Sequence, residues 1–352
     1  MKLLYRIAAL LITVLILLNC SDNESENDII KVGKAEVTLL VTPNGLGDNG
    51  YDDVAARGIF AFMEESGVPV RLLQPGNMAE AETMYRQWLS HNASADSMVL
   101  VAGSSAYEEL LKRIPPSLTG RGSRVLLFES NERIEGVSTL MVSRYGAAYL
   151  AGAMSKEFDA FIFAAAPGFS TLEDAIAGFR AGHSANSSGD RQLTLQYLAD
   201  GEEGFAMPDS AYHTIYRRAE QYWDYDEMIF PLLGGSGMGI TKFLNGDDFT
   251  QALSIGMDVD QAGQSRRIPF SMVIRIGDMI KSYLEDWLTG KEWPSARRPG
   301  LAEGATGIVI TPDFVDNVKI WDDRYEDNDA FLKLYNTYYK EAERKEAEYE
   351  QK

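Results

Sequence analysis

Two carboxylates close a short apolar run and are the side chains of this sequence best placed to do chemistry. Asp258 and Asp260 end the segment Ile255–Gln261, with one residue between them. Because alternate residues of a strand point to the same side, the two carboxylates are expected on one side of the chain. They could accept hydrogen bonds from a vicinal diol, act as general acid and base, or bind a hard cation, which needs more oxygen ligands than this pair supplies. We favour acceptance from a diol, with one of the two carboxylates structural.

A glycine-rich turn after the first predicted strand offers a second set of ligand groups. Residues 43–53 contain three glycines, which let a ligand approach the backbone, and they lead into a predicted helix whose first N–H groups are unpaired. Asp48 could accept hydrogen bonds from ligand hydroxyls, and Tyr51 could stack on a flat group. Asp52 and Asp53 fit ligand contact and helix capping equally well.

A second glycine-rich turn, Leu233–Gly239, follows another predicted strand. It lacks the Lys-Ser or Lys-Thr pair of a phosphate-binding loop, because residues 240–242 are Ile-Thr-Lys. The glycine spacing of dinucleotide-binding turns fails here as well. We therefore expect Gly234 and Gly235 to form a backbone cradle for an uncharged ligand edge, with a bare tight turn as the alternative.

Catalytic and cofactor motifs are absent from the sequence. The three histidines, His91, His183 and His213, are far apart, and neither the HExxH pattern nor the GxSxG elbow occurs. The sequence therefore predicts a binding protein with no catalytic residue, no metal and no cofactor.

The chain is strongly acidic. Its 352 residues carry a formal net charge of −19, and removal of a leader containing Lys2 and Arg6 would make the remainder more acidic still. Nucleic-acid binding depends on neutralising phosphates with Lys and Arg, so DNA and RNA are excluded as partners. Since Cys20 is the single cysteine, no disulfide can form within the chain, and packed cores must supply the stability.

The N-terminal segment has the composition of a bacterial export signal. Two basic residues precede the apolar run 7–18, which is shorter than the roughly 20 residues that cross a bilayer. Cys20 follows closely, so the segment resembles the lipobox of bacterial lipoproteins, in which that cysteine carries the lipid. We expect a signal peptide over residues 1–19, then a lipidated Cys20 with an acidic linker over 20–35. The protein would be anchored by lipid to a membrane of the bacterial cell envelope, facing the periplasm or the cell exterior.

Short apolar runs alternate with amphipathic segments along the rest of the chain, a pattern typical of parallel sheets with crossover helices. The alternation restarts near residue 143, and the chain is longer than one core usually accommodates. The sequence therefore predicts an α/β protein of two doubly wound parallel-sheet lobes joined by hinge crossovers. A long helix is expected at about Ser271–Thr289. The expected boundaries are 36–142 with 259–292 for lobe 1, 143–258 with 293–327 for lobe 2, and 328–352 for a charged C-terminal helix.

Several of these segments together resemble one family. Gly47–Asp53 resembles the GDxxFND turn of the basic membrane protein family, the purine nucleoside receptor A-type lipoproteins that serve ABC importers. Further motifs of that family, EGSYLAG, GFxAG, GGTG and IGVDxDQ, resemble Val142–Gly152, Ala177–Gly182, Gly234–Gly237 and Ile255–Gln261 in the same order. Ser271–Arg275 stands where TSxxK is usual, and the resemblance extends from about Glu36 to Thr311.

The resemblance implies a type I periplasmic-binding-protein fold and a nucleoside, of the purine class, captured for an ABC permease. Its aromatic residues would stack on the base and its charged residues would contact the ribose, and these positions correspond to Tyr51, Phe205, Asp48, Asp258, Asp260 and Arg275, with Gly234 and Gly235 as the cradle. Tyr at 51, Asp at 52 and Arg at 275 depart from the family's Phe, Asn and Lys. Alternatives are a binding protein for a sugar or other polar solute, a nucleoside-cleaving enzyme using the same acidic site, and a surface lipoprotein that binds a protein.

Overall fold

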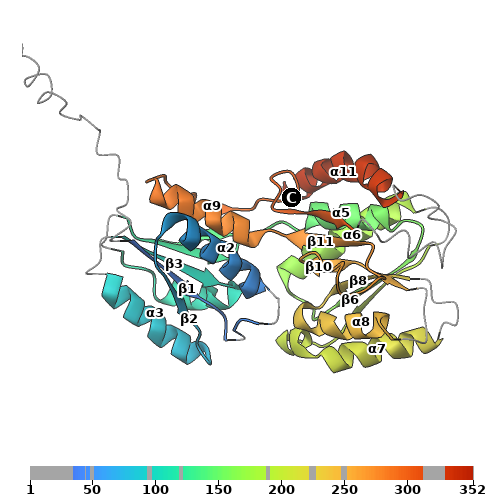
Figure 1. Ribbon diagram of the computed structural model, residues 1–352, viewed down its shortest axis with the longest axis horizontal. Coiled ribbons are helices and arrows are strands. Elements are labelled where there is room, and N and C mark those ends of the chain that lie inside the picture. Colours follow the sequence, from blue (N-terminus) through green and yellow to red (C-terminus); the bar gives the residue numbers. More distant parts are fainter. Residues whose placement is uncertain are drawn as a thin grey trace, which may run out of the picture.

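Two lobes lie side by side in the computed structural model of this chain (Figure 1). The structure describes residues 35–351 except 44, 48–50, 93–96, 119–121, 188–190, 222–226, 247–251 and 312–329. The expected signal peptide, lipidated Cys20, acidic linker and ligand residue Asp48 therefore lie outside the described residues. Within the part of the chain that is described, no helix is both long and apolar enough to span a membrane.

The first lobe is built on a parallel sheet of six strands in the order β12-β5-β4-β3-β1-β2. The strands are β1 (Ala35–Leu40), β2 (Val70–Leu73), β3 (Ser97–Gly103), β4 (Arg124–Phe128), β5 (Ser138–Leu140) and β12 (Ala296–Arg297). Alternate residues of β3 face different cores. Val99 and Val101 pack with α2 (Tyr51–Ser66) and α9 (Ile276–Leu288), whereas Leu100 packs with α3 (Met78–Asn92) and α4 (Glu108–Arg113). Helices thus cover both faces, as in a doubly wound sheet.

The second lobe contains the parallel sheet β7-β6-β8-β9 and a smaller sheet, β10-β11-β13, in which β13 is antiparallel to β11. The strands are β6 (Asp159–Ala164), β7 (Leu193–Tyr197), β8 (Glu227–Leu232), β9 (Leu253–Ser254), β10 (Gly256–Asp258), β11 (Phe270–Ile274) and β13 (Thr306–Ile310). The helices are α5 (Tyr145–Met154), α6 (Ser170–Asn186), α7 (Pro208–Gln221), α8 (Gly237–Leu244) and α11 (Ala330–Tyr349). Its core is rich in phenylalanine, and Phe179 of α6 stacks on Phe230 of β8 with ring centroids 4.4 Å apart.

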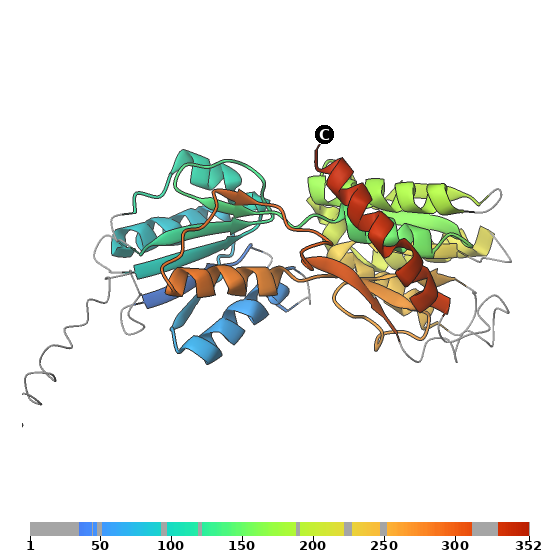
Figure 2. The same ribbon diagram turned by 90° about the horizontal axis from the view of Figure 1, so that it is seen from above.

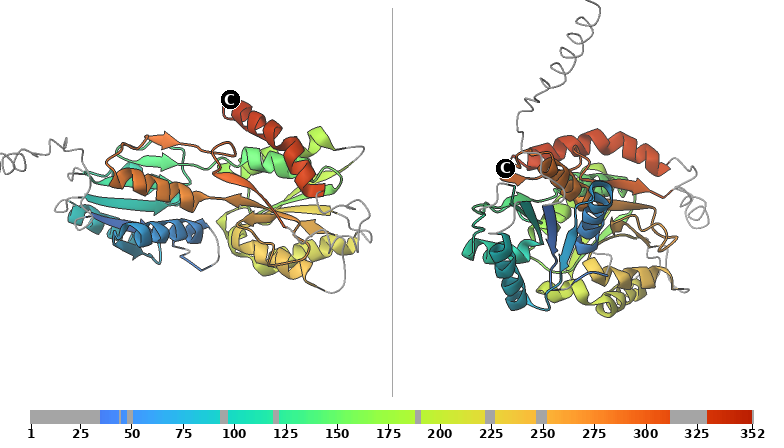
Figure 3. Two further views of the ribbon diagram at one scale, coloured as in Figure 1. Left: turned by 45° about the horizontal axis from the view of Figure 1, so that its top comes forward. Right: turned by 60° about the vertical axis from the view of Figure 1, so that its left-hand side comes forward.

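The chain passes between the lobes near residues 142–145, 272–276 and 297–301, as the two cores indicate. Val142 and Ile274 pack in the first core, whereas Tyr145, Met272 and Leu301 pack in the second. β12 pairs with β5 in the first lobe just before the last of these crossings. The segment from β11 into α9 bridges the junction directly (Figure 3).

The helix expected at Ser271–Thr289 begins later, because its first residues form strand β11. Phe270–Ile274 is entirely buried between β10 and β13, and α9 begins only at Ile276. The run Ser-Met-Val-Ile is largely apolar and includes two β-branched residues, which favours a buried strand with a neighbour on each side. Residues 268, 270 and 272 consequently pack in the second core, whereas the sequence analysis assigned 259–292 to lobe 1.

The α2–α9 crossing in the first lobe depends on two glycines. A Cβ on Gly58 would overlap the carbonyl group of Gly277, and a Cβ on Gly277 would overlap the carbonyl oxygen of Val54. We expect Gly58→Ala to lower the free energy of unfolding by about 1–3 kcal/mol, because the helices must separate. Chemical denaturation measures this loss. Gly263→Ala, whose Cβ would meet nothing within 4 Å, is the matched control, and an equal loss in both variants would contradict the close crossing.

His183 makes the second lobe sensitive to acid. Its Nε2 lies 2.9 Å from the carbonyl oxygen of Phe158, and burial lowers the pKa of the imidazole below its usual value. In the unfolded chain this imidazole binds a proton near pH 6.5, whereas in the folded protein it binds one only at lower pH. The free energy of unfolding therefore decreases as the pH falls from 7 towards 5. We expect this loss to be shallower in His183→Gln, by at most about 1.4 kcal/mol per pH unit. The exposed His213 serves as control, since His213→Gln should keep the parent's pH dependence of unfolding.

Candidate functional site

The carboxyl ends of the parallel strands in both lobes are where open α/β sheets bind ligands. In the first lobe, the turn after β1 is fixed from within by Asp52. Its Oδ2 accepts hydrogen bonds from the N–H of Thr42 at 3.0 Å and from the hydroxyl of Thr42 at 2.7 Å, and the residue is 7% exposed. Both carboxylate oxygens of Asp53 accept from the N–H of Gly47, at 3.1 and 3.0 Å. These contacts favour a structural use of both carboxylates over ligand contact.

The tyrosine beneath this turn reinforces it. The hydroxyl of Tyr107 donates to the carbonyl oxygen of Val41 at 2.6 Å, and both residues are buried. Burial raises the pKa of this phenol, and the negative charge of Asp52 raises it further. The phenol therefore stays protonated and keeps donating to the end of β1.

In the second lobe, the turns after β6, β7 and β8 are tied to one another. The hydroxyl of Ser236 donates to the carbonyl oxygen of Gly204 at 2.8 Å and accepts from the N–H of Met207 at 2.6 Å. A Cβ on Gly204 would overlap the carbonyl oxygen of Ala165, so this turn also touches the end of β6. Ser236 is fully buried, and it links the glycine turn predicted as a cradle to the turn that carries Phe205.

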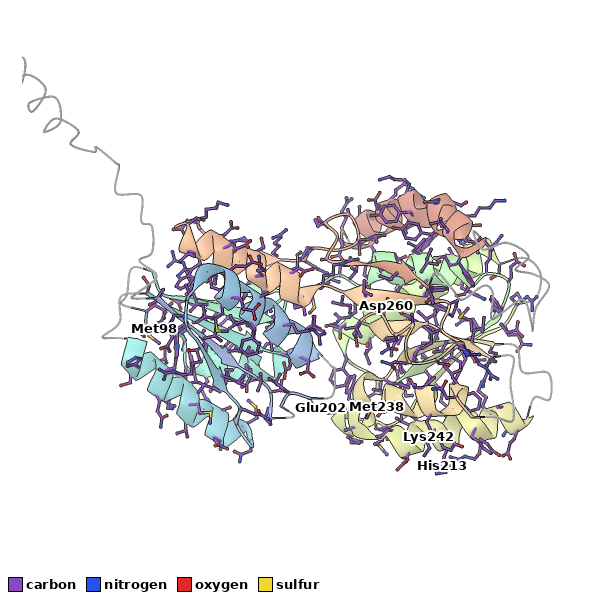
Figure 4. The ribbon with its side chains drawn as sticks, viewed as in Figure 1. Met98, Glu202, His213, Met238, Lys242 and Asp260 are labelled. Atoms are coloured by element: carbon purple, nitrogen blue, oxygen red, sulfur yellow. The ribbon has the colours of Figure 1, made fainter. Side chains whose placement is uncertain are left out.

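Phe205 lies against the glycine turn. A Cβ on Gly234, whose φ is +53°, would stand 3.1 Å from Cδ1 of Phe205. The rings of Phe169 and Phe205 form a T-shaped pair with centroids 5.1 Å apart and planes at 88°. Glu202, in the same turn as Phe205, and Met238, 59% exposed on α8, lie on the side of the second lobe that faces the first (Figure 4). The structure thus brings Phe205, Gly234 and Gly235 together at one strand edge.

A cavity of about 370 Å³ opens at the junction of the lobes, and three of the predicted residues line it: Asp258, Asp260 and Arg275. The first lobe contributes one side of α2 and the start of α9, while the second lobe contributes the turn after β10 and the side of β11 and β13. Apolar side chains of Val54, Val259, Val273 and Val309 form much of the remaining lining.

The three charged residues at this cavity are held differently. Oδ1 of Asp260 accepts from the N–H of Ala262 at 3.0 Å and faces the hydroxyl of Ser271 at 3.5 Å, which fixes the turn after β10. Arg275 donates from Nη1 to the carbonyl oxygen of Gly304 at 3.0 Å. Asp258 ends β10 with φ +67°, a left-handed conformation that a residue other than glycine adopts rarely. Asp260 and Arg275 therefore have structural contacts, and the left-handed backbone of Asp258, which Asp and Asn adopt more readily than most residues, marks it as a candidate functional position.

The charges around the cavity balance. Arg57, Arg275 and Lys281 line it together with Asp258, Asp260 and Asp278. Lys281 also pairs with Glu65 at 2.8 Å and with Glu285 at 2.5 Å, two carboxylates outside the cavity lining. Among the described residues, no cluster of three or more His, Cys, Asp or Glu side chains could bind a metal ion. The cavity therefore has no surplus of basic side chains for an anionic ligand.

A buried ion pair at the first crossing escaped the sequence analysis. Nη2 of Arg144, the residue before α5, lies 2.9 Å from Oε2 of Glu129, which follows β4 in the first lobe. The two side chains are 8% and 10% exposed, and Glu129 has φ +59°. The pair therefore joins the two lobes directly. Glu129 directly follows β4, and Phe169 lies in the turn between β6 and α6, so their place at strand ends was the available signal.

The predicted site residues thus fall into three places. Asp258, Asp260 and Arg275 line the cavity. Phe205, Gly234 and Gly235 lie together in the turns that follow the strands of the second lobe, and Asp52 lies in the turn after β1 of the first lobe. Tyr51 begins α2, but its side chain, like Asp48, lies outside the described residues. The residues missed were Arg57, Lys281, Phe169, Ser236, Glu129 and Arg144.

No protein-family model matches this sequence, and no curated protein matches it significantly. Solved structures do share the fold. The chain is similar to an ABC transporter solute-binding protein from Aeropyrum pernix, with 18% identity, a TM-score of 0.65 and coverage of 90% of both chains.

Two further solved structures resemble it. One is described as a transcriptional activator of the comK gene from Bacillus halodurans, with 16% identity, a TM-score of 0.63, and coverage of 86% of this chain and 97% of that one. The other is an ABC transporter solute-binding protein from Burkholderia graminis in complex with D-arabinose, with 14% identity, a TM-score of 0.56, and coverage of 81% and 98%. These likenesses establish the two-lobed α/β fold of periplasmic solute-binding proteins.

The tie through Ser236 can be tested by removing its hydroxyl. Ser236→Ala would leave the carbonyl of Gly204 and the N–H of Met207 without this partner. We expect a loss of about 1–3 kcal/mol in the free energy of unfolding and faster amide exchange across residues 202–207. Ser170→Ala, at the exposed first residue of α6, is the control. Unchanged exchange in Ser236→Ala would show that the turns are held by other contacts.

Proposed function

We propose that the chain is an exported solute-binding protein that closes two lobes around a nucleoside of the purine class and delivers it to an ABC permease. The observation that carries the proposal is the interlobe cavity with Asp258 at its edge. Both lobes line this cavity, so a ligand there would gain contacts from both when the lobes close. On this proposal the chain binds its ligand and performs no reaction on it.

The chemistry at the strand ends supports a neutral ligand with hydroxyl groups and a flat ring. A carboxylate at Asp258 can accept hydrogen bonds from two neighbouring hydroxyls, and the lack of surplus positive charge around it disfavours a highly anionic solute. Phe205, supported from the side by Phe169, offers a ring for stacking. A nucleoside combines a vicinal diol with a flat base.

The choice of a purine nucleoside as ligand also rests on the sequence motifs, which resemble those of the basic membrane protein family in the same order. The same resemblance supports a location outside the cytoplasm, with Cys20 as lipid anchor, and a permease as partner. The fold shared with the Aeropyrum pernix solute-binding protein is consistent with this use.

A sugar is the second candidate, and a specific observation favours it. The similar Burkholderia graminis protein was crystallised with D-arabinose, a ligand with hydroxyls and no base. A sugar would use the carboxylate of Asp258 and would gain less from a stacking ring. The two candidates therefore predict different binding of free ribose and of free base to the protein.

Thermal unfolding of the purified chain against purine and pyrimidine nucleosides, free bases, ribose, arabinose and hexoses separates these candidates. A ligand at about 100 times its Kd adds about 2.7 kcal/mol and raises the midpoint by several degrees. We expect purine nucleosides to raise it and ribose not to. A shift with ribose or arabinose alone would establish the sugar candidate, and conversion of inosine to hypoxanthine and ribose would contradict a pure binding function.

The two carboxylates at the end of β10 should differ in effect. Asparagine tolerates the left-handed conformation of residue 258, so Asp258→Asn removes the charge without new strain. We expect it to weaken binding by about 10- to 100-fold, because a charged acceptor for the ligand hydroxyls is lost. Asp260→Asn is the matched control, since Oδ1 of Asp260 already accepts from Ala262. Calorimetric titration measures both, and equal weakening would place Asp260 in the ligand contact as well.

A further inference from the structure

The C-terminal helix α11 lies across the second lobe, and its last turns reach the junction between the lobes (Figure 2). The sequence analysis expected only a charged helix there. Phe331, Ala342 and Glu346 are nevertheless buried, and Glu346 is 4% exposed. A buried carboxylate on a terminal helix needs a structural reason, because burying a charge is costly unless partners compensate.

The partners of Glu346 are two crossing segments. Its Oε1 accepts from the N–H of Gly146 at 3.0 Å, in the first turn of α5 just after the first crossing. Its Oε2 accepts from the N–H of Leu301 at 2.7 Å, just after the third crossing. The N–H of Ser143 also donates to the carbonyl oxygen of Pro299 at 2.9 Å, so the two crossings lie side by side. One carboxylate thus bridges the second-lobe ends of both.

Two glycines make room for this carboxylate. A Cβ on Gly146 would stand 2.8 Å from Cδ of Glu346, and a Cβ on Gly300 would overlap both its carboxylate oxygens. Real Cβ atoms do not approach so closely, so any other residue at either position would displace the carboxylate. The sequence therefore matches Glu346 to its two glycines over separations of 200 and 46 positions.

The last residues of the helix add contacts to the same segments. Oε1 of Glu350 accepts from the hydroxyl of Ser143 at 2.7 Å, and Oε2 lies 2.7 Å from Nε of Arg298. The ring of Tyr349 stacks on Tyr145 with centroids 4.1 Å apart. Its hydroxyl donates to Asp174, which also pairs with Arg298. Every one of these partners except Asp174 lies within a crossing or at its immediate end.

Burial raises the pKa of Glu346, and the N–H donors of Gly146 and Leu301 only partly offset that rise. Burying this carboxylate therefore carries a desolvation penalty that an apolar contact between the same segments would not carry. Such a group is best explained by the fixed geometry that its two hydrogen bonds impose.

We propose that Glu346 is a positioning residue of the hinge: through Gly146 and Leu301 it fixes the spacing of two crossings, and α11 thereby sets the axis about which the lobes move. The inference rests on the lobe movement of the proposed function and not on its ligand. Glu346 contacts no predicted ligand residue, and its effect on binding would be indirect.

The test measures the distance between the lobes without ligand. Spin labels on Gln87→Cys of α3 and Glu220→Cys of α7, both exposed, report this distance in the full chain carrying Cys20→Ser. We expect Glu346→Ala to broaden the distance distribution and to speed amide exchange at residues 146 and 301 by roughly tenfold or more. Glu341→Ala is the matched control, because Glu341 lies on the same helix and accepts from Tyr149 of α5 at 2.9 Å, away from the crossings.

The outcomes separate a hinge function from simple packing. A broader distribution in Glu346→Ala but not in Glu341→Ala supports the proposal, whatever the ligand panel shows. An unchanged distribution together with lower thermal stability in both variants would overturn it and leave α11 as a stabilising helix only. Should Glu346→Ala fail to fold, Glu346→Gln gives the same comparison, since its amide nitrogen would face one of the two N–H donors.

Discussion

The segments that cross between the lobes extend beyond the ends of strands β5, β11 and β12, so many of their backbone groups must find partners outside a strand ladder. The crossings supply many of these partners to one another. Ser143 donates to Pro299 at 2.9 Å, and Arg275 donates through its backbone to Ala305 at 2.8 Å. Glu346 accepts from the N–H groups of Gly146 and Leu301. The relative position of the lobes, and hence the cavity between them, depends on this satisfied bundle of short segments.

The two sides of the cavity are built by different physical means. In the first lobe α2 and α9 meet at Gly58 and Gly277, so their cavity-lining residues are placed by backbone-to-backbone contact. In the second lobe the strand-end turns are placed by hydrogen bonds to Ser236 and by the approach of Gly204 to Ala165. These contacts fix the strand ends within each lobe, so on the proposed function the crossings are the segments that would bend.

Periodicity predicted the two α/β lobes because each strand and helix buries a face that its own residues specify. It failed at Ser271–Ile274, because periodicity alone does not separate a short buried strand from a helix, and pairing with β10 and β13 makes this run a strand. The sequence singles out Asp258 because it ends a strand. The hydrogen bonds that Asp52 and Asp260 accept within the protein depend on the folded turns and could not be predicted from the sequence. Likewise no local pattern links Glu346 to Gly146, since that contact exists only after the second lobe has folded.

Among the described residues, most buried charged side chains lie near the hinge, and Asp52 in the first-lobe turn is the exception. Burial raises the pKa of Asp174 and of Glu346, and the pair of Glu129 with Arg144 is almost fully enclosed, all close to the crossings. Breaking such a pair costs far more than the pair contributes, so these positions tolerate little change. The strand-end turns, by contrast, carry candidate ligand residues such as Phe205 and Asp258. On the proposed function, substitution at the strand ends would change ligand preference, while the movement that captures the ligand would stay tied to the hinge.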